Sequence, residues 1–263
     1  MQFLTEIIEN KQVAPGYYFM KISVPEVACR AVPGQFLHVR VNNGLYPLLR
    51  RPLSLHEINP DKGIVGLLFQ VRGVGTELLS QKKAGEKIDV MGPLGKGFNL
   101  DFPGEKAVLV GGGIGIAPLY PLADRLVASG KRVTALIGNR SAESVLAVDK
   151  FTAIGCQVQV STNDGTKGLK GYVTELLEEY LMKTAADYVY ACGPGPMLAE
   201  IEKSCAKRQI PGQVSLEEYM GCGVGACLSC ACEREGVDDQ KYLKVCTDGP
   251  VFTLGEVKLN HEA

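Results

Sequence analysis

The sequence predicts a small antiparallel β-barrel, followed by an α/β domain on a parallel sheet and then by a short cysteine-rich segment. Three observations lead to this fold class. Residues 1–101 hold short β-like runs between turn residues, residues 102–216 alternate strands with helices, and residues 217–263 concentrate glycine and cysteine without regular periodicity. Short, punctuated strands are typical of barrels and sandwiches. Alternation of strands with helices is typical of an open parallel sheet.

The composition narrows the class of protein. A chain of 263 residues can build two hydrophobic cores, and 28 basic against 29 acidic residues give no electrostatic reason for a nucleic-acid or membrane partner. The first ten residues do not resemble a signal peptide, and the longest uncharged stretch, residues 107–123, contains four glycines and two prolines. Nine cysteines without an export signal are expected to be thiols or metal ligands, which predicts a cytoplasmic protein.

The strands predicted for the first region are residues 16–24, 35–41, 53–58, 64–71 and 87–91, with helical patterning only around residues 76–81. The start of the third of these strands carries a candidate anion-binding motif. Arg51-Pro52-Leu53-Ser54 has the form R-x-[YFL]-S, in which an arginine can pair with a pyrophosphate and a serine hydroxyl can reach a flavin. Alone the motif is weak, because an Arg-Arg-Pro turn is ordinarily the solvated start of a strand.

A second group of candidates follows downstream. The strand with Leu68, Phe69 and Gln70 leads into a glycine turn and a helix, and a helix N-terminus capped by Thr76 would be a natural anion site. The candidate flavin-binding residues are therefore Arg51, Pro52, Leu53, Ser54, Leu68, Phe69, Gln70, Gly75 and Thr76.

The second region has the rhythm of a parallel sheet, whose ligands lie beyond the carboxyl ends of the strands. Its five predicted strands are residues 107–110, 133–137, 157–161, 188–191 and 213–216. Its predicted helices are residues 118–129, 144–154, 172–182 and 196–207.

A glycine-rich turn joins the first of these strands to its helix. The backbone amides of Gly111, Gly112, Gly113 and Gly115 can meet a diphosphate, although tight packing explains such a turn equally well. Cys192 and Gly193, at the end of a later strand, strengthen the binding interpretation, but a small buried residue is an equal alternative for Cys192. Arg140 could hold an adenosine 2′-phosphate and favour NADP, or could be an ordinary surface arginine.

The cysteine segment gives the most specific signal. Cys222, Cys227 and Cys230 form C-x4-C-x2-C, and Cys246 follows after fifteen residues, which is the spacing of plant-type [2Fe–2S] sites. Interleaved glycines allow tight turns whose N–H groups can point at sulfur. A structural zinc site is the alternative, but zinc sites usually pair C-x2-C with another short pair. Cys232 competes for a ligand position; we choose Cys246, because Cys232 would crowd the iron bound by Cys230.

Other polar and sulfur-containing residues are not expected to bind ligands. We expect His38 to be a half-exposed strand residue, and His56 has no partner at metal-ligand spacing. Cys29, Cys156 and Cys205 are most simply core or surface residues.

The order of the motifs P-G-Q-F, R-P-L-S, G-x-G-T, G-P-L-G, G-G-G-I-G-x-A-P and C-G-P-x-P-M resembles the ferredoxin-reductase superfamily. With the cysteine segment at its end, nearly the whole chain resembles the electron-transfer subunits of NAD-dependent dihydroorotate dehydrogenase of type B. The resemblance implies FAD in residues 1–101, NAD in residues 102–216 with the Cys192–Gly193 turn facing the nicotinamide, and a [2Fe–2S] cluster in residues 217–263.

The resemblance also implies a partner and a pathway. An FMN-containing catalytic subunit would oxidise dihydroorotate in pyrimidine (UMP) biosynthesis, in a heterotetramer with two copies of each subunit. Electrons would pass from the FMN through the cluster to FAD and then to NAD⁺. The alternatives are an electron-transfer subunit of an NAD(P)H:ferredoxin oxidoreductase or sulfite reductase, and a zinc-stabilised binding module without redox activity.

Overall fold

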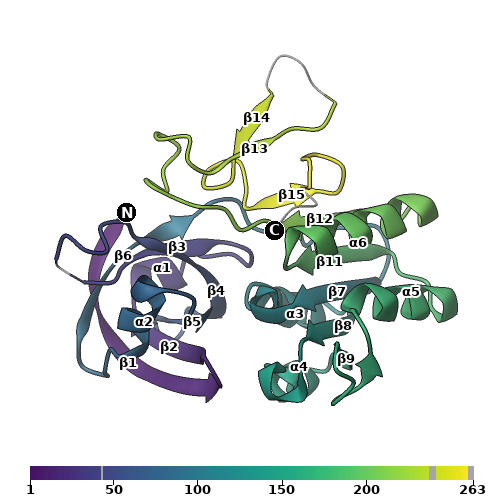
Figure 1. The fold of residues 1–263 in the computed structure, drawn as a ribbon, viewed down its shortest axis with the longest axis horizontal. Helices are drawn as coiled ribbons and strands as arrows, with labels where there is room; N and C mark the ends of the chain where they lie inside the picture. The colour runs from purple at the N-terminus through teal and green to yellow at the C-terminus, as the bar shows by residue number, and fades with distance from the viewer. Residues whose placement is uncertain (43, 237–240, 260–263) are drawn as a thin grey trace.

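The computed structural model describes residues 1–42, 44–236 and 241–259, and it contains a barrel, a seven-stranded sheet and a C-terminal segment (Figure 1). The barrel is closed and antiparallel, with strand order β1-β2-β5-β4-β3-β6. Its strands are β1 (Gln2–Ala14), β2 (Tyr17–Ser23), β3 (Phe36–Arg40), β4 (Arg51–Asn59), β5 (Ile64–Gln70) and β6 (Lys87–Leu94), and its short helices are α1 (Pro25–Ala28) and α2 (Val74–Ser80). The predicted barrel is confirmed.

The longest barrel strand, β1, was not predicted. Its inward side chains include Thr5 and Ile7, which are buried, while the intervening Leu4 and Glu6 face solvent. This is the period of two that a half-buried strand requires. Toward the end of the strand, charged residues interrupt this alternation. The segment is therefore a weak strand by composition, although it closes the barrel against β6.

The α/β region contains the five predicted strands and two more. The sheet order is β10-β9-β8-β7-β11-β12-β15, and every neighbouring pair is parallel except β12 with β15. Its strands are β7 (Lys106–Gly112), β8 (Arg132–Asn139), β9 (Gln157–Thr162), β10 (Leu169–Lys170), β11 (Tyr188–Cys192), β12 (Gly212–Ser215) and β15 (Val251–Thr253). The strand order reverses at β7, between β8 and β11, so the expected ligand crevice lies at the carboxyl ends of β7 and β11.

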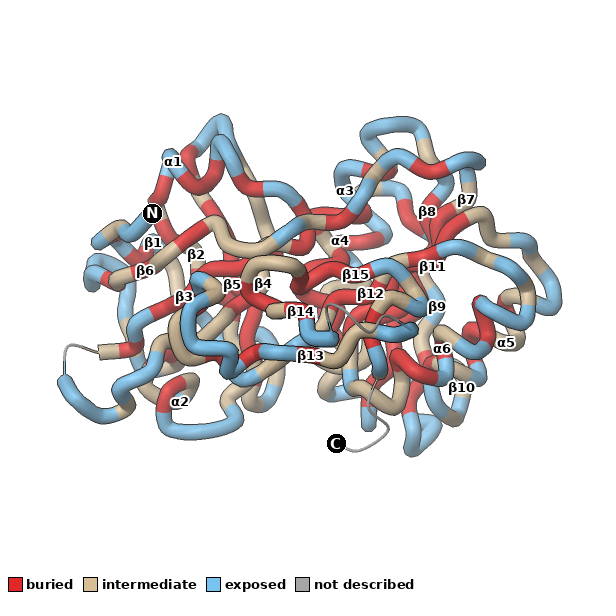
Figure 2. The backbone as a smooth tube through the Cα atoms, turned by 90° about the horizontal axis from the view of Figure 1, so that it is seen from above, coloured by how far each residue is buried: buried red, intermediate tan, exposed pale blue. Residues whose placement is uncertain are grey.

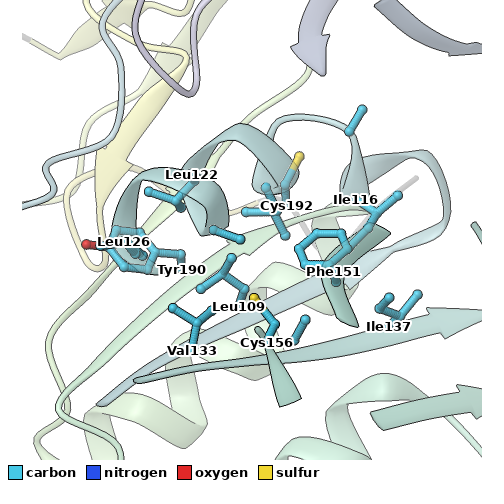
Figure 3. Close-up of a cluster of buried hydrophobic side chains, with 14 of the residues drawn as sticks. Leu109, Ile116, Leu122, Leu126, Val133, Ile137, Phe151, Cys156, Tyr190 and Cys192 are labelled. Carbon is cyan, nitrogen blue, oxygen red and sulfur yellow. The ribbon is translucent and has the colours of Figure 1, made fainter. Parts of the chain in front are cut away.

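Helices cover both faces of this sheet (Figure 1). The short 3₁₀ turn η1 (Gly113–Ile116) leads from β7 into α3 (Leu119–Ala128), which with α4 (Val148–Ala153) packs on one face together with side chains from the barrel. Figure 3 shows Tyr190 and Cys192 in this core beside Leu109, Leu122 and Phe151. A second 3₁₀ turn, η2 (Ala142–Ser144), follows β8. The opposite face is covered by α5 (Val173–Lys183) and α6 (Gly195–Arg208).

The C-terminal segment is more regular than the sequence indicated. It forms the hairpin of β13 (Ala231–Glu233) with β14 (Tyr242–Lys244), and then returns as β15 to extend the sheet. The hairpin lies over the junction of barrel and sheet in both views (Figure 1, Figure 2). The backbone of Gly249 accepts a hydrogen bond from Lys96 at 2.5 Å, and Pro250 accepts one from Leu216 at 2.9 Å. The segment is therefore joined to both neighbouring parts of the fold.

A buried histidine joins the barrel to the sheet. His56 on β4 is 1% exposed, and its Nδ1 lies 3.0 Å from the carbonyl oxygen of Ala117 at the start of α3. Its ring packs against Phe19 and Tyr120. Burial, with a smaller effect from the positive charge of Lys150, lowers the pKa of His56 to about 4. His56 is therefore a neutral structural contact between the two parts. Within the described ranges, no helix has both the length and the apolar character that a bilayer span requires.

Candidate functional site

The cysteine loop wraps around its own sulfur atoms. The Sγ atom of Cys222 accepts backbone N–H groups from Val224, Ala226 and Cys227 at 3.3–3.4 Å. Cys246 Sγ accepts the N–H of Gly225 at 3.2 Å. Such donors stabilise negative charge on sulfur. Gly225 takes a φ of +81°, which glycine adopts without strain, and Leu228 in the same loop takes a φ of +60°.

The four candidate ligands differ in their surroundings. Cys230 and Cys246 are 2% and 1% exposed, whereas Cys222 is half-buried and Cys227 is exposed. The N–H of Val224, assisted by those of Cys227 and Ala226, lowers the pKa of Cys222 to about 6, while burial raises the pKa of Cys246 to about 11. One side of the site therefore faces solvent, and the other joins the apolar core beneath the sheet.

This arrangement fits a two-iron cluster better than one zinc ion. A zinc site requires its ligands to converge on a single point at about 2.3 Å from each sulfur. Ligands spread around a loop, with N–H groups aimed at the sulfurs, fit a cluster with two irons. Cys232 lies apart on β13, where it is buried and its thiol donates to the carbonyl of Leu243 at 3.5 Å.

His38 is not half-exposed, as the sequence predicted, but fully buried, at 0% exposure. Leu37 and Val39 point into the barrel, so the period of two places His38 on the outer face of β3. The outer face is covered there by the cysteine loop: a Cβ at Gly223 would lie 2.6 Å from His38 Nδ1. Strand periodicity could not reveal this cover, because it comes from a segment far along the chain.

The two arginines at the start of β4 have different roles. Arg50 is held by Asp89, with Nη2 at 2.7 Å from the carboxylate, and both side chains are only 15% exposed. Arg51 has no carboxylate partner among the described residues and donates to the Leu49 carbonyl at 2.6 Å. Its guanidinium carbon would lie 2.8 Å from a Cβ on Gly75, so the arginine head packs against the start of α2. Arg51 is therefore the cation free to meet a pyrophosphate.

The remaining flavin candidates divide by the side of the strand they occupy. Ser54 and Pro52 pair with Phe36 and His38 on β3 and share the outer face with them. Leu68 packs toward η1 and α3, whereas Phe69 lies inside the barrel and can offer only its backbone outward. Gln70 is half-buried at the end of β5 and accepts a hydrogen bond from Arg72 at 2.8 Å.

Thr76 does not cap the helix from the position that the sequence predicted. The helix α2 begins at Val74, the capping residue is Gly73, and Thr76 is the third helical residue. Its hydroxyl turns back to accept the N–H of Arg72 at 2.9 Å. The hydroxyl thus serves the turn itself, as the third residue of a capping box does.

The glycine-rich turns after β7 and β11 are packed against one another. Gly111 and Cys192 pair across the two strands. A Cβ on Gly115 would overlap the carbonyl oxygen of Cys192 and lie 2.8 Å from the backbone nitrogen of Gly193. A Cβ on Gly112 would lie 2.5 Å from the sulfur of Met197. Packing therefore accounts for Gly112 and Gly115. The same packing brings the two glycine-rich turns, both candidates for nucleotide binding, together where the strand order of the sheet reverses.

Gly113, Cys192 and Arg140, which are also nucleotide candidates, differ in character. Gly113 has φ of +57° and open space where a Cβ would lie, so its glycine is required by conformation alone. Cys192 is 1% exposed, and burial raises the pKa of its thiol. Its side chain belongs to the core, and only its backbone can line the crevice. Arg140 is exposed after β8, and its carbonyl accepts the N–H of Asp164 at 3.2 Å.

Family comparisons agree with this geometry. A family model described as the iron–sulfur cluster binding domain of dihydroorotate dehydrogenase B matches residues 217–258. A model described as an oxidoreductase NAD-binding domain matches residues 109–203.

Curated relatives match along nearly the full length. The chain is 45% identical over 257 residues to the dihydroorotate dehydrogenase B (NAD⁺) electron transfer subunit of Desulforamulus reducens, with 97% of each chain covered. The subunit of the same name from a Geobacillus species is 44% identical over 255 residues, covering 96% of this chain and 97% of the relative.

Among solved structures, an NADH-dependent reduced ferredoxin-NADP oxidoreductase is 33% identical, with a TM-score of 0.88, covering 98% of this chain and 90% of that chain. The ferredoxin reductase of a carbazole 1,9a-dioxygenase is 20% identical with a TM-score of 0.67, covering 80% of this chain and 66% of that chain, and supports the fold alone.

Proposed function

The chain belongs to the family of electron-transfer subunits of dihydroorotate dehydrogenase B, and from this premise we propose that it carries electrons between a dihydroorotate-oxidising subunit and NAD⁺. The proposed order is the FMN of the catalytic subunit, the [2Fe–2S] cluster, FAD and then NAD⁺, in pyrimidine (UMP) biosynthesis. The observation that carries the proposal is the packing of the cysteine loop on β3, directly beside the strand with the flavin motif.

The residues that would hold each group follow from the geometry. Cys222, Cys227, Cys230 and Cys246 would bind the cluster, and the N–H groups around them would stabilise its negative charge. Arg51 would neutralise the FAD pyrophosphate, and Ser54 on the outer face of the barrel would orient the flavin. The turns at Gly111–Gly115 and Cys192–Gly193 would receive the nicotinamide nucleotide. When bound, FAD exchanges a hydride with nicotinamide and single electrons with the cluster.

The three proposed domains, residues 1–101, 102–216 and 217–263, correspond to these three groups. The supporting observation is that residues 2–94 supply every barrel strand and residues 106–215 supply six of the seven sheet strands. The last segment crosses the second boundary with β15, which pairs with β12, so we propose it as a cluster-binding extension of the sheet rather than an independent unit.

Exposed apolar residues lie on two loops, the loop before β4 and the cysteine loop. In the loop before β4, Leu45 is 86% exposed and Leu48 is 70% exposed. On the cysteine loop, Leu228 is 64% exposed beside the exposed Cys227. Clustered apolar side chains at the surface are typical of protein interfaces. They support docking of the FMN-containing subunit against the solvent-facing side of the cluster, in a heterotetramer with two copies of each chain.

A cytoplasmic location is also part of the proposal. All nine cysteines are free of disulfides in the structure, as a reducing compartment requires. NAD rather than NADP is proposed from the names of the relatives. The 33% identical ferredoxin-NADP oxidoreductase supports a second candidate, electron transfer to ferredoxin, although the dihydroorotate dehydrogenase subunits match at 41–45% identity.

An anaerobic titration tests the function. Purified protein should contain iron and acid-labile sulfide and absorb near about 450 nm, where flavin bands lie. NADH should reduce it, and with the FMN subunit added, dihydroorotate should reduce it as well. If dihydroorotate leaves the complex oxidised while NADH reduces it, the pyrimidine assignment is wrong and the ferredoxin alternative is favoured. If iron and sulfide are both absent, the redox assignment fails.

A further inference from the structure

His38 has no hydrogen-bond partner in the described structure, although its side chain is fully buried. Both Nδ1 and Nε2 are enclosed without an acceptor or donor in hydrogen-bond geometry. A buried polar group left unsatisfied destabilises the folded state, and such groups are rare enough in folded proteins to need a reason. A leucine or methionine would fill the same space without this cost.

The surroundings of His38 indicate which group its ring faces. Pro52 on β4 and Met91 on β6 lie opposite His38 in the two neighbouring strands, so the ring stands between them on the outer face of the barrel. The third neighbour is the cysteine loop at Gly223, where φ is +71°. Of the ring atoms, Nδ1 is nearest to the position of a Gly223 Cβ. A side chain at Gly223 would collide with the imidazole, so the bare backbone of the loop rests on the ring.

Two arginines lie near His38. Burial lowers the pKa of His38, and the positive charge of Arg50 lowers it further. Arg51 acts in the same direction, and Asp89 is engaged by Arg50. The backbones of Arg50 and Cys222 lie close enough to offset part of this shift, but not in hydrogen-bond geometry. An imidazole carries at least one N–H donor in either protonation state.

We propose that His38 is a positioning residue that donates its imidazole N–H to a sulfur of the bound cluster, at the Cys222 end of the loop. This inference rests on the proposed function, since it requires the cluster. It explains why a histidine, rather than an apolar residue, occupies the outer face of β3 beneath Gly223. It also gives the barrel strand next to the flavin motif a direct bond to the cluster. Hydrogen bonds to sulfur raise the reduction potential of such clusters, because they stabilise the more negative reduced state.

The test compares substitutions at His38 in the complete, anaerobically purified protein. His38→Met removes the N–H and fills the same space with a flexible side chain, and His38→Leu is a second variant of the same kind. His38→Gln keeps an N–H donor. Val39→Ala is the matched control, because Val39 is the next residue along β3 but points into the barrel and away from the cysteine loop.

Two readouts separate a hydrogen bond from a merely structural role. The first is the midpoint potential of the cluster from an EPR-monitored redox titration. We expect it to fall in His38→Met and His38→Leu, to stay near the original in His38→Gln, and to be unchanged in Val39→Ala. The second is pulsed EPR on protein labelled with ¹⁵N-histidine, where a nitrogen coupling should be present in the original protein and lost in His38→Met.

The outcomes distinguish this inference from the proposed function. If the original protein contains no iron or sulfide, the proposed function fails first. If the cluster is present but its midpoint and nitrogen coupling are unchanged in His38→Met and His38→Leu, the inference is wrong and the function stands. If the FAD midpoint shifts instead of the cluster midpoint, His38 serves the flavin, and the inference is likewise overturned.

Discussion

Replacing Gly115 by alanine tests the packing of the two glycine-rich turns that we assign to the nucleotide. A Cβ at this position would overlap the carbonyl oxygen of Cys192, 2.5 Å from its carbonyl carbon and 2.8 Å from the nitrogen of Gly193. These are backbone atoms at the end of a central strand, so no side chain can rotate to make room. Overpacking of this kind lowers the stability of the folded state by about 1–3 kcal/mol. Because the neighbouring atoms are rigid backbone, we expect a loss at the upper end of this range, about 3 kcal/mol.

This cost predicts a measurable change in two assays. In thermal unfolding, about 3 kcal/mol corresponds to a Tm lower by about 6–12 °C for a protein of this size. The turn η1 and the end of β11 must also move apart, which displaces the amides that would meet the diphosphate. We expect NADH to reduce the bound flavin with an apparent affinity at least about tenfold weaker, which corresponds to about 1.4 kcal/mol.

Gly113→Ala provides the matched control for Gly115→Ala. Gly113 lies in the same turn with φ of +57° and open space around its Cβ position, so alanine there meets conformational strain of about 1–2 kcal/mol but no collision. It should lower the Tm less than Gly115→Ala does, because no backbone atom is displaced. A Gly115→Ala protein with an unchanged Tm and unchanged NADH affinity would refute the reasoning.

Three further predictions concern the flavin, the cluster and the joint between barrel and sheet. Arg51→Gln should weaken FAD binding about 10–100-fold, the effect of losing a charge-assisted hydrogen bond, whereas Arg50→Gln should mainly destabilise the barrel. Equilibrium dialysis measures the loss of FAD and thermal unfolding measures the loss of stability. Equal loss of FAD in both variants would contradict the assignment. Cys246→Ser should abolish cluster loading and Cys232→Ser should retain it, as measured by iron and acid-labile sulfide per chain; the opposite result would exchange their roles. His56 has a folded pKa of about 4, below its ordinary 6.5, so the folded state binds fewer protons, and its contribution is fully present above pH 6.5 and lost as the pH falls toward 4. Urea unfolding between pH 7.5 and pH 4 should show about 3 kcal/mol of this loss, absent in His56→Phe; the same pH dependence in both proteins would contradict it.

Local patterns in the sequence predicted most of the architecture. The alternation of strands and helices after residue 102 follows from short-range hydrophobic spacing, which is why β7, β8, β9, β11 and β12 were all anticipated. The barrel strands β2 to β6 were anticipated for the same reason. The cysteine spacing was equally informative, because ligand positions around a compact cluster are set by the length of chain between them.

Features that depend on contacts between distant segments could not be predicted. His38 has the sequence context of an exposed strand residue, and only the return of the cysteine loop buries it. Likewise β15 is three residues long and becomes a strand only because β12 offers an edge. The different roles of Arg50 and Arg51 depend on Asp89, which is on another barrel strand. The predicted helix start at Thr76 differs from the observed start at Val74 for a local reason, since the start of a helix is uncertain by a few residues when glycines precede it.

The position of β15 has a consequence for how the protein must be handled. Strand β12 would otherwise present a row of unpaired backbone groups, and such an edge invites pairing with a second chain. The residues that lead into β15 directly follow Cys246. We therefore expect oxidative destruction of the cluster to loosen β15, the strand that covers this edge. Air-exposed preparations should therefore lose colloidal solubility together with their colour, and aggregation would serve as an early sign of metal loss.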